Sequence, residues 1–161
     1  MTKQISNGVN KISVISLDKK FEKFKKDAEK VALKILKISN KSDISAEIYL
    51  IGNQKMKFLN KKFRGKDKIT NILSFEEPLN FICPPPAGGL KHKKIGEIYL
   101  NLEKTMDYGL QTTDKKAVDC SLLTVDRLLT HGFLHLFGYN HQKKNDRMKM
   151  ERIEQFILAR L

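Results

Sequence analysis

The sequence predicts a small α/β (α+β) fold, in which a mixed β-sheet of about four strands carries packed helices. The chain has 161 residues, the length of one ordinary domain, and 40% of them are hydrophobic, which is enough for one core. Short segments rich in β-branched residues alternate with longer amphipathic segments. We therefore expect residues 1–161 to form a single domain, a mostly mixed sheet with helices packed on it.

The first half of the chain is expected to alternate strand and helix twice. Residues 11–16 (KISVIS) and 44–52 (ISAEIYLIG) have the β-branched and aromatic composition of strands. Residues 17–39 place apolar side chains at spacings of three and four, which predicts an amphipathic helix. Residues 53–65 repeat that spacing, and Gly65 is expected to end this second helix.

The second half is expected to hold two strands, a long loop and two helices. Strands are predicted over residues 70–75 (TNILSF) and 95–102 (IGEIYLNL). The loop 76–94 contains consecutive prolines and a glycine pair, and a loop of this length is either mobile or functional. One helix is predicted from about residue 115 to Gly138, a residue type that suits a helix end, and another from about residue 146 onward.

Composition and charge limit the class of protein. No segment approaches the roughly 20 apolar residues of a membrane span, and the N-terminus lacks the apolar run of a signal peptide, so we expect a cytoplasmic protein. Cys83 and Cys120 form no C-x-x-C pair and are expected to be packing or loop residues. The net charge of +13 favours nucleic acid as a partner, and the alternative is a lysine-rich solvated surface.

Three of the four histidines lie within residues 131–141 (HGFLHLFGYNH). On a helix, His131 and His135 share one face, and Gly138 allows the chain to reverse so that His141 returns to the same point. Three neutral nitrogen donors suit one zinc ion, and without a fourth protein donor one position stays open, as in catalytic zinc sites. The alternative is that the imidazoles are ordinary core or surface side chains.

The same spacing matches the metzincin peptidase pattern H-E-x-x-H-x-x-G-x-x-H, but Gly132 replaces the glutamate that acts as general base. A peptidase of that kind would lack its base. Three neutral ligands also leave the ion its full +2 charge, which suits a phosphodiester better than a neutral amide. The metalloprotease-like helix therefore favours phosphate chemistry, with a zinc metallopeptidase as the alternative.

The histidine motif, together with residues 59–75 (LNKKFRGKDKITNILSF) and 95–102, resembles the YbeY family of ribosomal RNA maturation endoribonucleases. The resemblance runs in order from about Ile44 to the last helix. It implies a cytoplasmic, zinc-dependent, single-strand-specific endoribonuclease that acts in 16S rRNA 3′-end maturation and ribosome quality control. It also implies RNA and ribosomal particles as partners, with ribosomal proteins or GTPases, and no membrane. A further alternative is a non-catalytic ribosome-assembly factor that is stabilised by its metal.

The resemblance also implies roles for particular residues. The three histidines would be the ligands of one zinc ion, and Arg64 would hold or polarise the scissile phosphate. A guanidinium presents a planar fork to phosphate oxygens and stabilises charge that develops on them, although Arg64 could also be an ordinary surface residue. Lys66 and Lys68 are candidates for contacts with the RNA backbone, and Ser74 for the wall of the cleft.

Two departures from the family pattern concern residues expected behind the histidines. Asn140 stands where the family has aspartate before the third histidine, and Asn71 stands where the upstream block usually reads T-D-V-L-S-F. Because carboxylates orient ligating histidines, both exchanges are expected to lower metal affinity or rate, although an amide can still make one of the same hydrogen bonds. The loop 76–94 is longer than usual for the family, and we expect His92 within it to face water.

Overall fold

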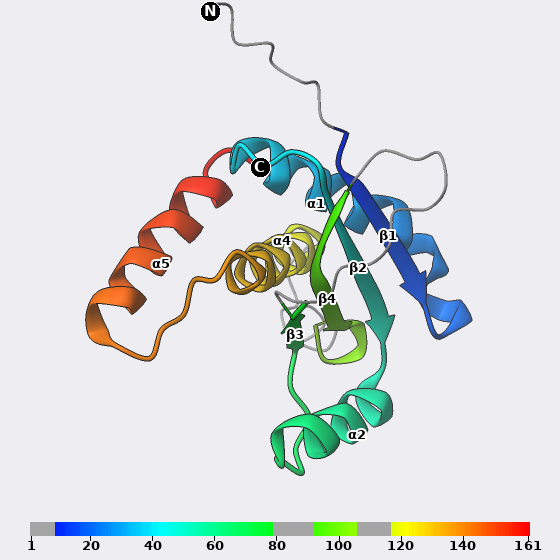
Figure 1. Ribbon diagram of the computed structural model, residues 1–161. Coiled ribbons are helices and arrows are strands. Elements are labelled where there is room, and N and C mark those ends of the chain that lie inside the picture. The colour runs from blue at the N-terminus through cyan, green and yellow to red at the C-terminus, as the bar shows by residue number, and fades with distance from the viewer. Residues whose placement is uncertain (1–8, 79–91, 106–116) are drawn as a thin grey trace, which may run out of the picture.

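The computed structural model describes residues 9–78, 92–105 and 117–161, without the side chains of residues 117–124. One sheet with the order β1-β2-β4-β3 is formed by β1 (Lys11–Ser16), β2 (Ile44–Ile51), β3 (Ile72–Glu76) and β4 (Lys93–Asn101). Strands β1, β2 and β4 are parallel, and β3 is antiparallel to β4 (Figure 1). The predicted class, a mixed four-stranded sheet with helices packed on it, is confirmed.

Helices follow the strands in the predicted order (Figure 1). The described helices are η1 (Lys19–Phe24), α1 (Lys25–Ile38), α2 (Asn53–Arg64), α4 (Ala117–Leu136) and α5 (Lys144–Leu158). Helix α1 packs against β1, α4 packs against β3 and β4, and the two helices also touch each other. Helix α2 lies beyond the end of β2, and α5 lies on the outer side of α4.

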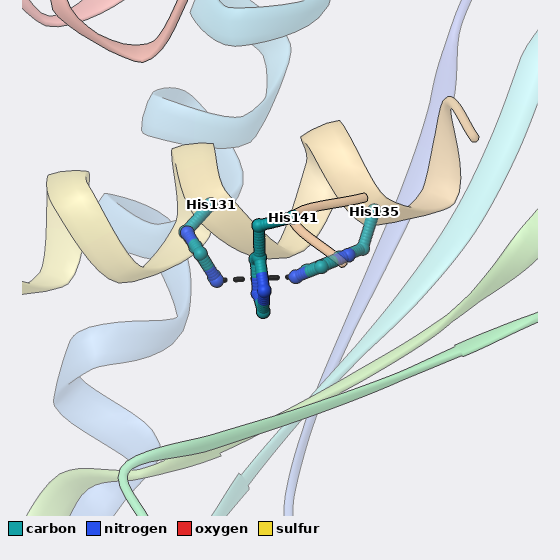
Figure 2. Close-up of side chains that lie close together, drawn as sticks. All are labelled: His131, His135 and His141. Atoms are coloured by element: carbon teal, nitrogen blue, oxygen red, sulfur yellow. Dashed lines mark hydrogen bonds between the residues drawn. The ribbon is translucent and has the colours of Figure 1, made fainter. Parts of the chain in front are cut away.

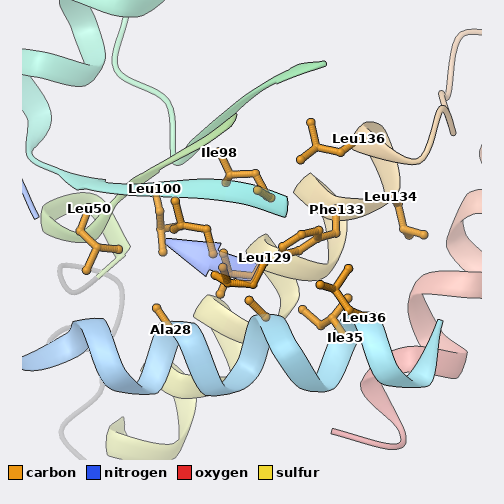
Figure 3. Packing of buried hydrophobic residues seen from close by; sticks show 14 of the residues in the cluster. Ala28, Ile35, Leu36, Leu50, Ile98, Leu100, Leu129, Phe133, Leu134 and Leu136 are labelled. Atoms are coloured by element: carbon orange, nitrogen blue, oxygen red, sulfur yellow. The ribbon is translucent and has the colours of Figure 1, made fainter. Parts of the chain in front are cut away.

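The main core lies between the sheet and the helices α1 and α4 (Figure 3). Alternate residues of β2 are buried in it, as expected for a strand with one face on a core. Completely buried side chains from the helices, such as Ile35, Leu129 and Phe133, meet Ile48 and other strand residues there. Each large apolar side chain buried in this way contributes about 1.5–3 kcal/mol.

The structure differs from the sequence predictions mainly at the ends of elements. The helix predicted over residues 17–39 begins as the 3₁₀ helix η1, because the side chain of Asp18 accepts a hydrogen bond from the Lys20 backbone N–H and caps a tighter turn. The strand predicted over residues 95–102 is β4, which begins at Lys93, and residues 102–105 are already helical. Most of the predicted loop 76–94, with Cys83, lies outside the described residues, and so does the side chain of Cys120.

Gly96 allows β4 to pair with both of its neighbours. The pairing of β2 with β4 shifts register between Ser45 and Ala46, so that Ala46 faces Gly96 instead of Ile95. Gly96 adopts φ +146°, and a Cβ there would lie 2.2 Å from the carbonyl oxygen of Phe75 on β3. A glycine is therefore needed at this irregular point of the sheet.

Replacing this glycine should destabilise the fold. We expect Gly96→Ala to lower the free energy of unfolding by about 3 kcal/mol, because the new Cβ must displace β3 and the φ angle disfavours any other residue. Thermal unfolding followed by circular dichroism measures the change, at roughly 2–4 °C per kcal/mol for a chain of this size.

Gly65→Ala is the matched control. Gly65 has φ +66°, but nothing lies within 4 Å of a Cβ built there, so the variant should lose about 1–2 kcal/mol from the φ angle alone. Equal losses in the two variants would show that the close approach of β3 to Gly96 is not what makes glycine necessary.

Candidate metal centre

The position of the first two histidines follows from how α4 packs on the sheet. At Gly132 the helix backbone comes so close that a Cβ would lie 2.9 Å from Cδ1 of Ile72 and 3.1 Å from Cδ1 of Ile98. This contact fixes the rotation of the helix about its axis. His131 precedes Gly132 by one residue, so its side chain projects about 100° away from the sheet contact, with His135 one turn further on.

The end of α4 places the third histidine. Gly138 adopts φ +88°, its N–H donates to the carbonyl of His135 (2.8 Å), and the Tyr139 N–H donates to the carbonyl of Leu134 (3.0 Å). These two bonds define a Schellman turn, as the glycine after the helical pattern predicts. The turn directs the chain back along the helix, and His141 follows within three residues.

The three imidazoles point toward one another (Figure 2). One ring nitrogen from each histidine lies within 4.8 Å of the other two, and Nε2 of His131 is 3.1 Å from Nε2 of His135. Two nitrogens bound to one tetrahedral zinc ion at about 2.0–2.1 Å would lie about 3.4 Å apart. The cluster therefore has the donor atoms and nearly the spacing of a three-histidine metal site.

The hydrogen bonds around His135 leave its Nε2 free to bind a metal. Nδ1 of His135 lies 3.0 Å from the Tyr139 carbonyl oxygen, which can only accept, so Nδ1 carries the proton and Nε2 has the lone pair. Burial, followed by the charges that His131, His141 and Arg64 can carry, lowers the pKa of His135. The ring is therefore neutral at pH 7, as metal binding requires.

Glu154 on α5 lies beside His131, and the sequence did not predict it. Its Oε1 lies 3.5 Å from Nδ1 of His131, and its side chain is only 11% exposed. A carboxylate behind a ligating histidine favours the proton on Nδ1 and raises the basicity of Nε2. The two Nε2 atoms lie 3.1 Å apart, close enough for both to bind one cation once neither carries a proton.

Arg64 is the last residue of α2 and lies close enough to the cluster for its charge to act on His135. The N-terminus of α2 is anchored where the Asn53 N–H donates to Oε2 of Glu103 (2.6 Å). Gly65 ends the helix with φ +66°, as predicted. Arg64 is exposed, so its guanidinium is available to an anion beside the histidines.

The other residues with predicted roles lie at different distances from the cluster. Lys66 and Lys68 are exposed in the turn after α2, where the carbonyl of Lys68 accepts from Asn60 Nδ2 (2.7 Å). Ser74 is half-buried on β3, paired with Ile98. None of the three contributes to the described lining of the cleft beside the histidines, so their contacts with RNA stay predictions.

The two asparagines expected behind the histidines have different surroundings. Asn140 is exposed, and its Oδ1 accepts a hydrogen bond from the Gln142 N–H (3.4 Å), so it supports the turn that carries His141. Asn71 lines the cleft together with His131, and its Oδ1 is buried with no partner among the described residues. His92, expected to face water, is instead half-buried with its Nδ1 shielded from solvent.

A cleft of about 940 Å³ opens beside the cluster, between α4, α5 and the start of β3. His131 and His141 form part of its wall, so the site is accessible to a ligand. Its described lining also includes three cationic side chains, those of Lys104, Arg127 and Arg147, and two carboxylates, those of Glu151 and Glu154. Arg147 pairs with Glu151 and Glu154 lies beside His131, so Lys104 and Arg127, together with a bound metal ion, would supply the positive charge for an anionic substrate.

Comparisons with known proteins show which family the chain is similar to. A family model described as Endoribonuclease YbeY matches residues 4–161. A protein named Endoribonuclease YbeY from Thermodesulfovibrio yellowstonii is 34% identical over 149 residues, which cover 92% of this chain and 86% of that protein. Another of the same name, from Thermoanaerobacter sp. (strain X514), is 27% identical over 162 residues, with coverage of 98% and 95%.

A solved structure has also been compared. The solution structure of TM1509 from Thermotoga maritima aligns with 94% of this chain and 91% of that one, at 22% sequence identity and a TM-score of 0.44.

The fold and the site define a small α/β protein with a three-histidine cluster that can hold a metal ion. The chain belongs to the Endoribonuclease YbeY family, which confirms the resemblance read from the sequence. It is therefore a nuclease of the endoribonuclease class, and RNA is the substrate that the family implies.

Removing the carboxylate behind His131 should weaken metal binding. We expect Glu154→Gln to lower the affinity for zinc by about 10–100-fold, because an amide holds the Nδ1 proton less strongly. Competition with a chromophoric chelator measures the affinity. The ¹⁵N chemical shifts of His131 should also show loss of the preference for a proton on Nδ1.

Glu151→Gln serves as the control. Glu151 lies one turn before Glu154 on α5 but is exposed and pairs with Arg147 (3.3 Å), so its variant should keep the affinity for zinc. If both variants bind zinc as the wild type does, Glu154 does not orient a metal ligand.

Proposed function

We propose that this protein is a zinc-dependent, single-strand-specific endoribonuclease that acts in the cytoplasm in 16S rRNA 3′-end maturation and ribosome quality control. The observation that carries the metal-dependent part is the convergence of His131, His135 and His141, with ring nitrogens within 4.8 Å of one another. Ribosomal particles, together with ribosomal proteins or GTPases, are the proposed partners. No helix within the described residues is long and apolar enough to cross a membrane.

Zinc fits the donor set better than a hard cation does. Imidazole nitrogen is a preferred ligand of zinc, whereas magnesium and calcium prefer oxygen. Three neutral ligands leave an open position, so a bound ion would supply a Lewis acid that acidifies water and stabilises charge on a phosphate.

The chain's own residues would orient the reacting groups. The Tyr139 carbonyl and Glu154 hold His135 and His131 with their Nε2 atoms directed to one point. The Arg64 guanidinium, on the side of His135, would donate to the scissile phosphate and stabilise the charge that develops there. The net charge of +13 would draw the polyanionic substrate to the protein.

Packing at Gly132 weighs against the peptidase alternative. The glutamate of a peptidase motif would have to stand where even a Cβ lies 2.9 Å from Ile72. A carboxylate forced into this apolar contact would be destabilising and would point at the sheet, not at the metal site. The close contact of α4 with the sheet therefore explains why a glutamate, the general base of the peptidase motif, does not fit at position 132.

Cleavage assays with two variants test the proposal. We expect His135→Ala to lose bound zinc and RNA cleavage together, because it removes one of three ligands. Arg64→Ala should keep zinc but lose about 10²–10³-fold in kcat, the usual effect of removing a donor to a developing oxyanion. Metal analysis and cleavage of a labelled single-stranded RNA measure both quantities.

Arg152→Ala is the matched control. Arg152 is an exposed arginine of α5 outside the described cleft lining, so this variant should cleave RNA as the wild type does. Equal activity of wild type, Arg64→Ala and His135→Ala with saturating zinc would contradict the nuclease mechanism. If folded His135→Ala also bound ribosomal particles normally and the wild type showed no turnover, the non-catalytic assembly factor would be favoured. Release of fragments from casein without RNA cleavage would favour the peptidase.

A further inference from the structure

Helix α4 carries an arginine in line with the two helical histidines. Arg127, His131 and His135 follow one another at intervals of four residues, which places them on one face at steps of about 6 Å along the axis. Arg127 is exposed and lines the same cleft as His131. The guanidinium therefore lies one helical turn beyond the metal cluster, inside the cleft.

Arg127 differs from the other cations of the cleft in its contacts. Arg147 pairs with Glu151 (3.3 Å), and Nζ of Lys104 donates to the Ile69 carbonyl oxygen (3.3 Å). Within residues 9–78, 92–105 and 125–161, Arg127 has neither an ion pair nor a side-chain hydrogen bond. Its five N–H donors can therefore bind an external anion without breaking a described contact.

A second exposed arginine, Arg64, ends α2, whereas Arg127 lies on α4 one turn before His131. The two elements therefore each offer a guanidinium to a polyanion. Repeated negative charge along a flexible chain, as in single-stranded RNA, matches this arrangement.

Asn71, just before β3, adds a polar side chain to the lining of the cleft. Its Oδ1 is buried without a partner in the described part of the chain, although Asn71 lines the cleft. The backbone carbonyl of Asn71 accepts a hydrogen bond from the Asn101 N–H (2.8 Å), so this bond does not involve the side-chain amide. A ribose 2′-hydroxyl both donates and accepts, so it can pair with whichever atom of this amide is turned toward the cleft, and a deoxyribose cannot.

We propose that the cleft between α4 and α5 binds the part of a single-stranded RNA on one side of the cleaved bond, with Arg127 on a phosphate and Asn71 on a 2′-hydroxyl. This inference rests on the proposed function, since it names how the substrate crosses the same site. Arg64 then contacts the scissile phosphate, and Arg127 positions the neighbouring nucleotide.

Binding assays on the full-length, zinc-loaded protein test the arginine. Fluorescence anisotropy with a short labelled single-stranded RNA is recorded on ice, and a gel confirms that the RNA is still intact. Arg127→Ala should weaken binding about tenfold at low salt, as loss of a charge-assisted hydrogen bond predicts. The slope of log K against log salt should shrink by about 0.7, the value for one phosphate contact with a single strand.

Arg152→Ala, with the same loss of charge on α5 but outside the cleft lining, should bind RNA within about twofold of the wild type. Zinc content should be unchanged in both variants. Equal affinities and equal salt slopes for Arg127→Ala and Arg152→Ala would overturn the proposal.

The asparagine is tested by comparing RNA with DNA of the same sequence. Asn71→Ala should weaken RNA binding and leave DNA binding unchanged, so that the preference for RNA falls. An equal change for both nucleic acids would refute the 2′-hydroxyl contact.

Binding and cleavage separate this proposal from the one on which it rests. If the wild type cuts no RNA but Arg127→Ala binds it more weakly than Arg152→Ala does, the nuclease mechanism fails and the RNA cleft stands. If the wild type cuts RNA and the two variants bind it equally, the proposed role of the cleft in RNA binding is wrong, and the nuclease function stands.

Discussion

The close approach of α4 to the sheet at Gly132 is the constraint on which the site depends. Without a side chain at this position, the helix lies against Ile72 and Ile98, and one rotation about its axis is fixed. That rotation buries Leu129 and Phe133 in the core. It leaves the face of α4 that carries His131 directed to the cleft. The apolar packing energy of the core therefore also sets the orientation of the histidines, before any metal binds.

A second constraint is that each helical histidine is held from a different part of the chain. The Schellman turn at Gly138 brings the Tyr139 carbonyl to His135, so this partner is local and is set by the backbone. Glu154 reaches His131 from α5, so this partner depends on how α5 packs on α4. Because the buried Met150 and Ile157 fix α5 in the core, the metal cluster and the C-terminal helix stabilise each other's position.

The sequence predicted the parts of the site that depend on local geometry. Helical spacing brings His131 and His135 together, and a glycine in the left-handed region reverses the chain, so short-range rules were sufficient. Glu154 could not be predicted, because its contact requires the relative positions of two helices. Arg127 could have been found, since it precedes His131 by four residues. Asn140 was expected to orient a histidine, but a short amide side chain next to a turn also pairs readily with nearby backbone, as the contact with Gln142 shows.

The two faces of the sheet offer different charged groups to a polyanion. Because Ile48 and Ile98 face the core, the residues that alternate with them lie on the opposite face of the sheet. That face carries three carboxylates around Lys94 and two stacked tyrosines: Glu47, Glu77, Glu97, Tyr49 and Tyr99. Burial and hydrogen bonds to these carboxylates raise the pKa of both tyrosines, so the phenols stay protonated and add no negative charge. Lys94 is therefore already paired with carboxylates, whereas Arg127 on the α4 side has no described partner and is available to a phosphate.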